Sequence, residues 1–293
     1  MISRNLRGIA LVVFSMAAFS VEDAFVKALT GGLPIGQVLV MLGIGGAVVF
    51  AALVGPSAWR RMWAALLVPQ VALRTAAEAV SGLTFVTALS LVPISTVAAV
   101  FQATPLATTA GAALFFGEAV GWRRWAAIVA GFAGVLLILR PGFEGFQPEA
   151  ALVLVTVVTI AVRDLITRRI PAGIPSMAIS FHGFFAVILA GAGLLAFGPA
   201  PLPVSTLNWM QIAFAVACGT SGYYAIVAAM RAADASSLMP FRYSRLVFSM
   251  IIGAMVFAER PDPYTIAGAA VIVAAAFYTY LRERKLALTA PTA

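Results

Sequence analysis

Charged residues are scarce in this chain. Asp, Glu, Lys and Arg make up only 10% of its 293 residues, whereas 62% of the residues are hydrophobic, and the mean hydropathy is +1.01. About a quarter of the residues of an ordinary soluble domain are charged, and such a domain could not bury this much apolar surface. The composition therefore excludes a soluble globular protein and predicts one that spans a lipid bilayer.

Cysteine and histidine are almost absent as well. A single cysteine, Cys218, excludes a disulfide framework and a cysteine-built metal site. A single histidine, His182, cannot form an imidazole cluster for zinc or iron, and we interpret it as a packed or headgroup-facing side chain. The sequence also lacks a Gly-x-x-x-x-Gly-Lys-Ser/Thr motif for ATP, so any pumping must draw on a gradient. We therefore expect no metal and no cofactor.

The net charge of +8 could suggest a nucleic-acid partner, but the basic residues are scattered as short pairs between apolar segments. This is the pattern of cytoplasmic loops in membrane proteins. If the amino terminus is cytoplasmic, only Arg140 and Arg260 flank the outer side. Twelve basic residues then flank the cytoplasmic side: Arg4, Arg7, Arg60, Arg61, Arg123, Arg124, Arg168, Arg169, Arg231, Arg282, Arg284 and Lys285. We expect both termini in the cytoplasm, the lipid bilayer of the inner (plasma) membrane as surroundings, and no nucleic acid.

Ten apolar segments, most of them about 20 residues or longer, are long enough to cross the bilayer core. Short clusters of Gly and Pro separate them, and no connection could hold a soluble domain. The sequence therefore predicts an all-α integral membrane protein with ten transmembrane helices. They are placed near residues 8–29, 34–54, 66–91, 94–116, 122–140, 149–168, 175–197, 208–230, 236–258 and 263–281.

The two halves of the chain align without a gap at a fixed offset of 141 residues. A period of this length marks a duplicated half-protein, so residues 1–141 and 142–293 are predicted to be two five-helix repeats. Because five is odd, the second repeat inserts upside down relative to the first. Inverted repeats are typical of transporters, whose site lies between the halves near mid-membrane. Identical residues at this offset include Asp23 and Asp164, Pro34 and Pro175, Ser95 and Ser236, and Glu118 and Glu259.

Each repeat carries a glutamate after its fourth helix, in Phe116-Gly117-Glu118 and Phe257-Ala258-Glu259, and then a helix rich in small residues. With these features the chain resembles the drug/metabolite transporter superfamily in its two-domain EamA form, over essentially its whole length. The resemblance implies an exporter of small organic solutes, and many relatives export amino acids. The second repeat departs from the pattern at Arg260-Pro261-Asp262-Pro263, which changes a loop and not a site.

Small residues in the fifth and tenth helices lie at helical spacing. They either close each bundle at its edge or meet another copy of the chain, so a monomer and a homodimer both remain open. They include Ala127, Gly131, Gly134, Gly268 and Ala269.

Nine charged residues lie away from the ends of the spans, where each costs about 2.5 to 3.5 kcal/mol. They are Glu22, Asp23, Lys27, Arg74, Glu78, Arg163, Asp164, Arg242 and Arg245. Spacings of four residues predict ion pairs on one helical face between Asp23 and Lys27, Arg74 and Glu78, and Asp164 and Arg168. We assign Asp23, Lys27, Arg74, Arg163 and Asp164 to ion pairs, which could also latch alternating gates.

Glu78 and Arg245 are expected at similar depth near mid-membrane, with Arg242 one turn below Arg245 on the same face. The two arginines have no acidic neighbour on their own helix. Two interpretations stay open: a fixed salt bridge between Glu78 and Arg245, or an arginine that receives a substrate carboxylate. Both hold if the pair lines a cavity wall.

Prolines within two spans, in Thr104-Pro105 and Met239-Pro240, predict bent helices beside a cavity. The polar run from Cys218 to Tyr224 points to the same region, although Gly, Ser and Thr in spans also serve helix packing. The set suits a small amphiphile with a carboxylate, such as an amino acid. The candidate substrate-binding residues are Glu78, Phe101, Gln102, Tyr223, Arg242, Tyr243, Ser244 and Arg245.

The sequence thus favours a secondary transporter that exports amino acids of broad range, aromatic and apolar ones included, by alternating access. Other small metabolites or drugs, sugar phosphates and nucleotide sugars remain alternatives within the same fold. An intramembrane aspartyl enzyme is excluded because Asp23 and Asp164 should lie roughly 15 Å apart along the membrane normal. A channel is disfavoured by the paired repeats and by the lack of a filter-like motif.

Cysteine labelling tests the expected orientation. In a Cys218→Ser background, Gln147→Cys should react with a membrane-impermeant reagent added from outside, whereas Arg60→Cys should be spared, because the positive-inside count places residue 60 in the cytoplasm. The reverse labelling pattern would contradict the inverted-repeat topology.

Overall fold

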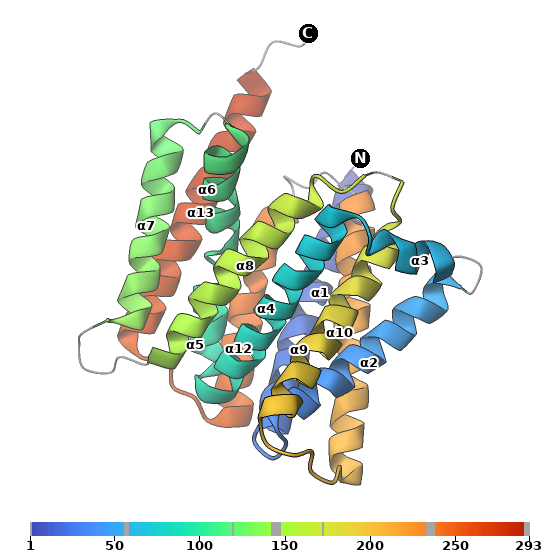
Figure 1. Ribbon diagram of the computed structural model, residues 1–293. Helices are drawn as coiled ribbons and strands as arrows, with labels where there is room; N and C mark the ends of the chain where they lie inside the picture. The colour runs from blue at the N-terminus through green and yellow to red at the C-terminus, as the bar shows by residue number, and fades with distance from the viewer. Residues whose placement is uncertain are drawn as a thin grey trace. The chain divides into compact units, whose positions relative to one another are not determined.

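The computed structural model describes residues 2–55, 59–118, 120–141, 148–171, 173–232 and 238–289, and every regular element in these ranges is a helix (Figure 1). The helices are α1 (Ile2–Thr30), α2 (Ile35–Val54), α3 (Trp59–Ala65), α4 (Pro69–Leu91), α5 (Ile94–Phe101), α6 (Thr104–Phe116), α7 (Trp122–Leu139), η2 (Pro148–Ala150), α8 (Ala151–Thr167), α9 (Ser176–Phe197), α10 (Thr206–Ala232), η3 (Met239–Tyr243), α12 (Ser244–Phe257) and α13 (Pro263–Thr289).

Seven helical stretches of the described chain are long and apolar enough to cross a bilayer, which makes this a multi-pass membrane protein. The expected spans near 66–91, 208–230 and 236–258 are not among the seven. Charges lower the hydropathy of α4, and a 3₁₀ turn leaves α12 with 14 residues. The count of ten spans therefore stays a prediction. The seven stretches are Leu6–Thr30, Ile35–Val54, Ile94–Phe116, Trp122–Leu139, Pro148–Thr167, Met177–Phe197 and Pro263–Arg282.

The chain forms two compact units, and each draws on both halves of the sequence. Unit 1 consists of Met1–Val21, Pro93–Pro148 and Ser221–Ala293, and unit 2 consists of Glu22–Val92 and Glu149–Thr220. Helices α1 and α10 each contribute one part to each unit. The compact units are therefore not the two sequence repeats, and the repeat boundary at residues 141 and 142 stays a prediction.

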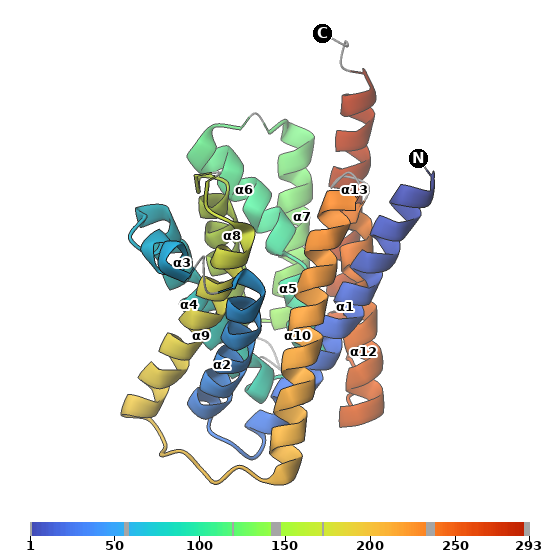
Figure 2. The ribbon, with the colours of Figure 1, turned by 90° about the vertical axis from the view of Figure 1, so that its right-hand side faces the viewer.

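In unit 2, α2 packs along α9, and α4 packs against α8 and α9 (Figures 1 and 2). Glycines bring α2 and α9 into backbone contact. A Cβ atom on Gly36 would lie 2.8 Å from the carbonyl oxygen of Gly191, and one on Gly191 would lie 2.6 Å from that of Gly36. Close approach through small residues is how membrane helices gain packing energy where lipid offers no hydrophobic drive.

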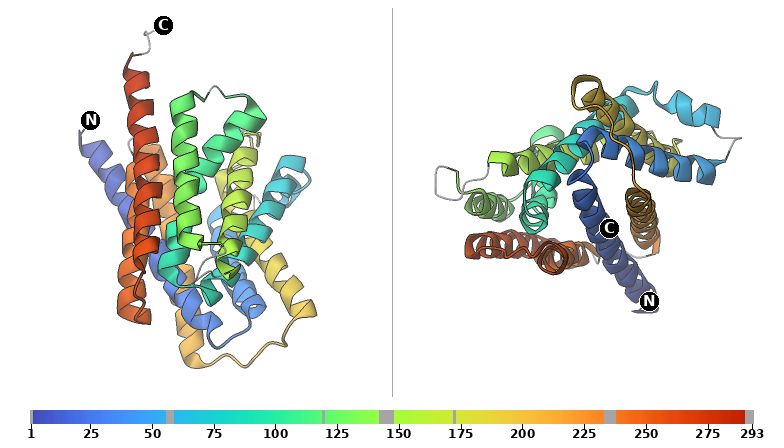
Figure 3. Two further views of the ribbon diagram at one scale, coloured as in Figure 1. Left: turned by 90° about the vertical axis from the view of Figure 1, so that its left-hand side faces the viewer. Right: turned by 90° about the horizontal axis from the view of Figure 1, so that it is seen from below.

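In unit 1, α7 and α13 run side by side (Figure 3). A Cβ atom on Gly134 would lie 2.8 Å from the carbonyl oxygen of Gly268. Ala127 is buried against Leu106 and Ala275 in the same unit. These small residues therefore pack helices within the chain, the first of the two roles that the sequence left open, while the oligomeric state stays untested.

The prolines expected inside spans stand at the starts of new helices. α5 ends at Phe101, and α6 begins at Thr104 with Pro105 in its first turn. Likewise Pro240 lies in the first turn of η3, which leads into α12. A first-turn proline removes an N–H that would have had no helical partner, so the chain breaks cleanly at these positions.

The carboxylate of Glu259 caps the start of α5. It accepts hydrogen bonds from the backbone N–H groups of Ile94 (2.8 Å) and Ser95 (3.2 Å) and from the Ser95 hydroxyl (2.9 Å). Gly253 makes room for it, since a Cβ atom there would lie 2.7 Å from Glu259 Oε2. One of the two glutamates that follow the fourth helix of each repeat therefore stabilises the start of a helix. The equivalent target of Glu118, near Ser236, lies outside the described residues.

The ammonium of Lys27 caps the end of α4. Its Nζ donates to the carbonyl oxygens of Leu89 (3.1 Å) and Val92 (2.5 Å). The sequence had assigned Lys27 to a pair with Asp23, four residues away; the structure gives it this additional role. The helix dipole places partial negative charge at a helix C-terminus and partial positive charge at an N-terminus, so the cation of Lys27 and the anion of Glu259 are both stabilising at these positions.

Asp262 caps α13. Its carboxylate accepts hydrogen bonds from the Tyr264 and Thr265 N–H groups (3.0 and 3.2 Å) and from the Thr265 hydroxyl (2.7 Å), and it pairs with Arg140 at 3.0 Å. Burial opposes its ionisation, but these partners outweigh burial and lower the pKa of Asp262. The Arg260–Pro263 departure from the family pattern is therefore a helix cap.

Removing the α5 cap should destabilise the protein. We expect Glu259→Ala to cost about 1 to 2 kcal/mol, because two N–H groups in an apolar environment lose their acceptor. Thermal unfolding in detergent measures this. The neighbouring Arg260→Ala is the control and should change stability by less than about 0.5 kcal/mol. Equal melting temperatures for the two variants would contradict the cap.

Candidate functional site

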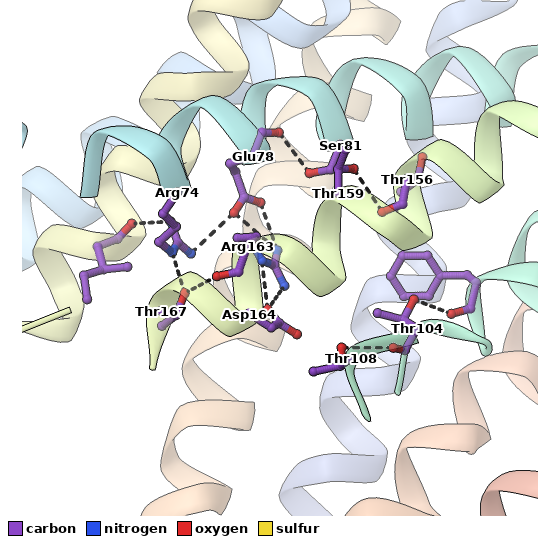
Figure 4. Close-up of polar contacts among 12 residues, drawn as sticks. Arg74, Glu78, Ser81, Thr104, Thr108, Thr156, Thr159, Arg163, Asp164 and Thr167 are labelled. Atoms are coloured by element: carbon purple, nitrogen blue, oxygen red, sulfur yellow. Dashed lines mark hydrogen bonds and ion pairs between the residues drawn. The ribbon is translucent and has the colours of Figure 1, made fainter. Parts of the chain in front are cut away.

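Four charged residues of unit 2 gather between α4 and α8, and Figure 4 shows the Arg163 guanidinium between the carboxylates of Glu78 and Asp164. Arg163 Nη1 lies 3.1 Å from Glu78 Oε1. Its Nε and Nη2 atoms lie 3.0 and 2.8 Å from Asp164 Oδ1. One guanidinium thus joins two carboxylates from two helices.

Arg74 completes this cluster from α4. Its Nη2 lies 3.4 Å from Glu78 Oε2, Nε donates to Thr167 Oγ1 at 3.1 Å, and Nη1 donates to the Ile179 carbonyl at 3.3 Å. Arg74 is buried. Two arginines and two carboxylates balance formally, as charges inside a membrane must.

Glu78 finds two counter-ions within unit 2, Arg74 and Arg163. Whether Glu78 also pairs with Arg245 stays a prediction. The Arg74–Glu78 pair forms as its spacing of four residues suggested. The pairing of Arg163 with Glu78, 85 residues away in the chain, was not foreseen.

A second cluster lies in unit 1, where two aromatic rings flank the guanidinium of Arg245. Its Cζ atom lies 4.9 Å from the ring centroid of Phe101 and 5.5 Å from that of Phe19. The Phe19 ring rests on Gly222, where a Cβ atom would be 3.1 Å from Phe19 Cε1. Cation–π contacts of this kind stabilise a cation that is partly removed from water.

The two helix breaks of unit 1 meet at this cluster. Gln102, which joins α5 to α6, donates from Nε2 to the carbonyl oxygen of Tyr243 at 3.3 Å, at the end of η3. These two residues are equivalent at the 141-residue offset. At the start of α12, the Ser244 hydroxyl donates to the Phe241 carbonyl at 2.7 Å, which ties it to the preceding 3₁₀ helix η3. Side chains thus satisfy the backbone carbonyls of Tyr243 and Phe241 at the second break.

The remaining candidates differ in their surroundings. Arg242 is exposed and Tyr223 is half-buried. Asp23 is buried, with 5% of its surface exposed. His182 is completely buried, and its Nε2 lies 3.0 Å from the Met62 carbonyl oxygen. This supports a packed His182 and not one that faces headgroups.

Most of the polar run on α10 serves packing. A Cβ atom on Gly219 would lie 2.7 Å from Glu22 Cδ, and the Thr220 hydroxyl donates to the Val216 carbonyl at 2.7 Å. The repeat offset explains the first contact, since Glu22 aligns with Arg163 and Gly219 with Glu78. The positions that form the Arg163–Glu78 ion pair in one repeat arrangement are thus also in contact in the other, but there they hold Glu22 and Gly219 and form no ion pair. That offset could have predicted Glu22; nothing in the sequence singles out Phe19, which aligns with Ile160.

Comparison with known proteins identifies the family to which this sequence is similar. The sequence profile of the EamA-like transporter family matches residues 6–140 and again 147–281. A solved structure titled "Crystal structure of protein" shares the fold, with a TM-score of 0.62 and 21% identity over 95% of this chain and 98% of that one.

Three curated relatives show the range of similar proteins. An S-adenosylmethionine uptake transporter of Rickettsia felis is 30% identical over 67% of this chain and 66% of its own length. A riboflavin transporter of Rhizobium johnstonii is 30% identical over 69% of this chain and 66% of its own length. The pseudopaline exporter CntI of Pseudomonas aeruginosa is 24% identical over 92% and 94%. The chain thus spans just under two thirds of the first two relatives, and all three are named as transporters.

Proposed function

The chain belongs to the EamA-like transporter family, and from this premise we propose that it is a secondary transporter of small amphiphilic solutes that carry a carboxylate, amino acids and their derivatives above all. The named relatives transport organic metabolites of very different shape, which supports a broad solute range in the family, although riboflavin carries no carboxylate and falls outside the class proposed for this chain. S-adenosylmethionine is itself an amino-acid derivative with an aromatic base, so it falls within the proposed class.

The observation that carries the proposal is the guanidinium of Arg245, whose Cζ atom lies over the rings of both Phe19 and Phe101. The N–H donors of a guanidinium lie in its plane and match a carboxylate geometrically. The rings around it suit an apolar or aromatic body. The carboxylate and the aromatic side chain of an amino acid could therefore both be bound by the Arg245 cluster in unit 1.

Export is the direction that we propose. The relative that aligns over 92% of this chain is named as an exporter, whereas the uptake transporter aligns over 67%. Alternating access can run in either direction, and solute gradients decide the net flux.

Few fixed polar groups in the Arg245 cluster imply weak discrimination among side chains. One methylene in an apolar pocket is worth only about 1 to 3 kcal/mol. We therefore expect alanine, leucine, phenylalanine, tryptophan and S-adenosylmethionine all to compete for transport in proteoliposomes. Arg245→Gln should weaken all of them about tenfold or more, because they share the carboxylate.

Phe101→Ala should change the ranking of these competitors more than the maximum rate, with large substrates losing most. The matched control is Phe25→Ala, which removes a ring that stacks on Phe214 in unit 2 at 5.8 Å. If only one amino acid competes, or if amino acids fail while sugar phosphates or nucleotide sugars succeed, the proposal is wrong and that branch of the fold becomes the better assignment.

A further inference from the structure

Helix α3 connects α2 to α4 within unit 2, and it presents large apolar and charged side chains on its surface (Figure 1). It begins at Trp59, and hydrogen bonds from each N–H to the carbonyl three residues earlier continue its turns from Leu66 to Val68. Trp59 and Trp63 are 45% and 46% exposed, and Leu67 is 85% exposed. Exposed apolar side chains that lie together mark a surface that meets a partner or a membrane.

α3 lies at the membrane surface where α2 leaves the bilayer. Both α2 and α9 are long and apolar enough to cross the bilayer. They run antiparallel, since Gly36 lies against Gly191 and Gly46 lies against Phe184, so the end of α2 and the start of α9 share one membrane surface. α3 follows the end of α2 and packs on the first turns of α9 through Phe181, which places it at that surface.

Unit 2 holds α3 in a defined orientation. The indole Nε1 of Trp59 donates to the Ala51 carbonyl at 3.1 Å, in the last turn of α2. The Met62 carbonyl accepts a hydrogen bond of 3.0 Å from Nε2 of the buried His182 on α9. The Trp63 ring meets two rings of α9 edge-on, with centroids 5.2 and 5.3 Å away, those of Phe181 and Phe185.

The apolar side chains of α3 have separate protein-facing and exposed sides. Met62 and Ala65 are buried. Trp59, Trp63 and Leu67 follow one another at intervals of four residues, so they lie on one side of the helix, and this side is exposed. Tryptophan is typical of the layer between lipid headgroups and acyl chains, where its ring is apolar and its N–H is polar.

Two arginines add positive charge beside this exposed side. Arg60 and Arg61 are both exposed, and among the described residues no ion pair or side-chain hydrogen bond engages either of them. The duplicated fold does not require them, because the equivalent positions of the second repeat hold Pro201 and Leu202, in a segment with no helix before Thr206. Cations next to tryptophans at a membrane surface are complementary to the headgroups and chains of anionic lipids.

We propose that α3 is an interfacial helix that binds anionic phospholipids. The guanidinium groups of Arg60 and Arg61 pair with the headgroup phosphates, since a guanidinium matches a phosphate in two parallel hydrogen bonds. The exposed side formed by Trp59, Trp63 and Leu67 lies against the upper part of the acyl chains. A zwitterionic lipid carries its own cation beside the phosphate, so the two arginines favour a lipid with net negative charge. This role does not depend on which solute the protein carries.

Quenching by brominated lipids measures which lipid lies at α3. A fluorophore is attached at Leu67→Cys in a Cys218→Ser background, and the full-length protein is placed in nanodiscs of phosphatidylcholine and phosphatidylglycerol. The same mole fraction of brominated chains is carried by one lipid or by the other. We expect the relative association constant to favour phosphatidylglycerol by about fivefold to twentyfold at low salt, and by less at high salt, because headgroup attraction is screened.

The double substitution Arg60→Gln with Arg61→Gln should bring this ratio to within about twofold of one, while brominated phosphatidylcholine still quenches the label. Arg60→Lys with Arg61→Lys keeps both charges, should keep most of the ratio, and serves if the glutamine variant does not fold. The matched control is Arg123→Gln with Arg124→Gln, which removes the same charge from α7 in unit 1 and should leave the ratio at Leu67→Cys unchanged.

Equal association of the two lipids with the wild-type helix would overturn the proposal. So would a label that neither lipid quenches, because α3 would then face water or another protein chain. A ratio that survives both glutamine substitutions would overturn the role of the arginines, and an equal loss in the α7 control would show an effect of net charge alone.

Discussion

Backbone polar groups at helix ends inside a membrane must find partners within the protein, and much of this structure follows from that constraint. The chain breaks its helices at Gln102 and before Ser244, and it turns sharply at Pro93. Each of these points brings a compensating group: Glu259 at the start of α5, Lys27 at the end of α4, and the Gln102 amide at the end of η3. Residues that look like isolated intramembrane charges thus allow the helices to end where they do.

The same constraint explains why the buried charges of unit 2 pair with one another. Arg74, Glu78 and Arg163 neutralise one another between packed helices, and this network spares the protein the cost of isolated ions. The guanidinium of Arg245, which we propose for the solute carboxylate, lies over two aromatic rings of unit 1.

The sequence predicted what depends on local or periodic information. Composition gave a multi-pass helical membrane protein, and the family profile matches twice, as a duplicated chain requires. The prolines marked the helix breaks, and a spacing of four residues gave the Arg74–Glu78 pair. Contacts between distant segments could not be predicted from the sequence. No periodicity encodes that Arg163 contacts Glu78, or that Glu259 contacts Ile94, 165 residues away. For the same reason the sequence did not predict that each compact unit contains segments from both halves of the chain. The repeats record a duplication, whereas packing decides which helices form a unit.

Counterflow in proteoliposomes distinguishes a carrier from a pore, because only a carrier couples the movement of two solute molecules through one binding site. Vesicles that contain the protein and are preloaded with unlabelled phenylalanine receive a trace of labelled phenylalanine outside. We expect the labelled solute to accumulate transiently above its external concentration, at an initial rate that saturates with external phenylalanine. A flux that rises linearly with concentration and shows no transient accumulation would contradict a carrier and indicate a pore.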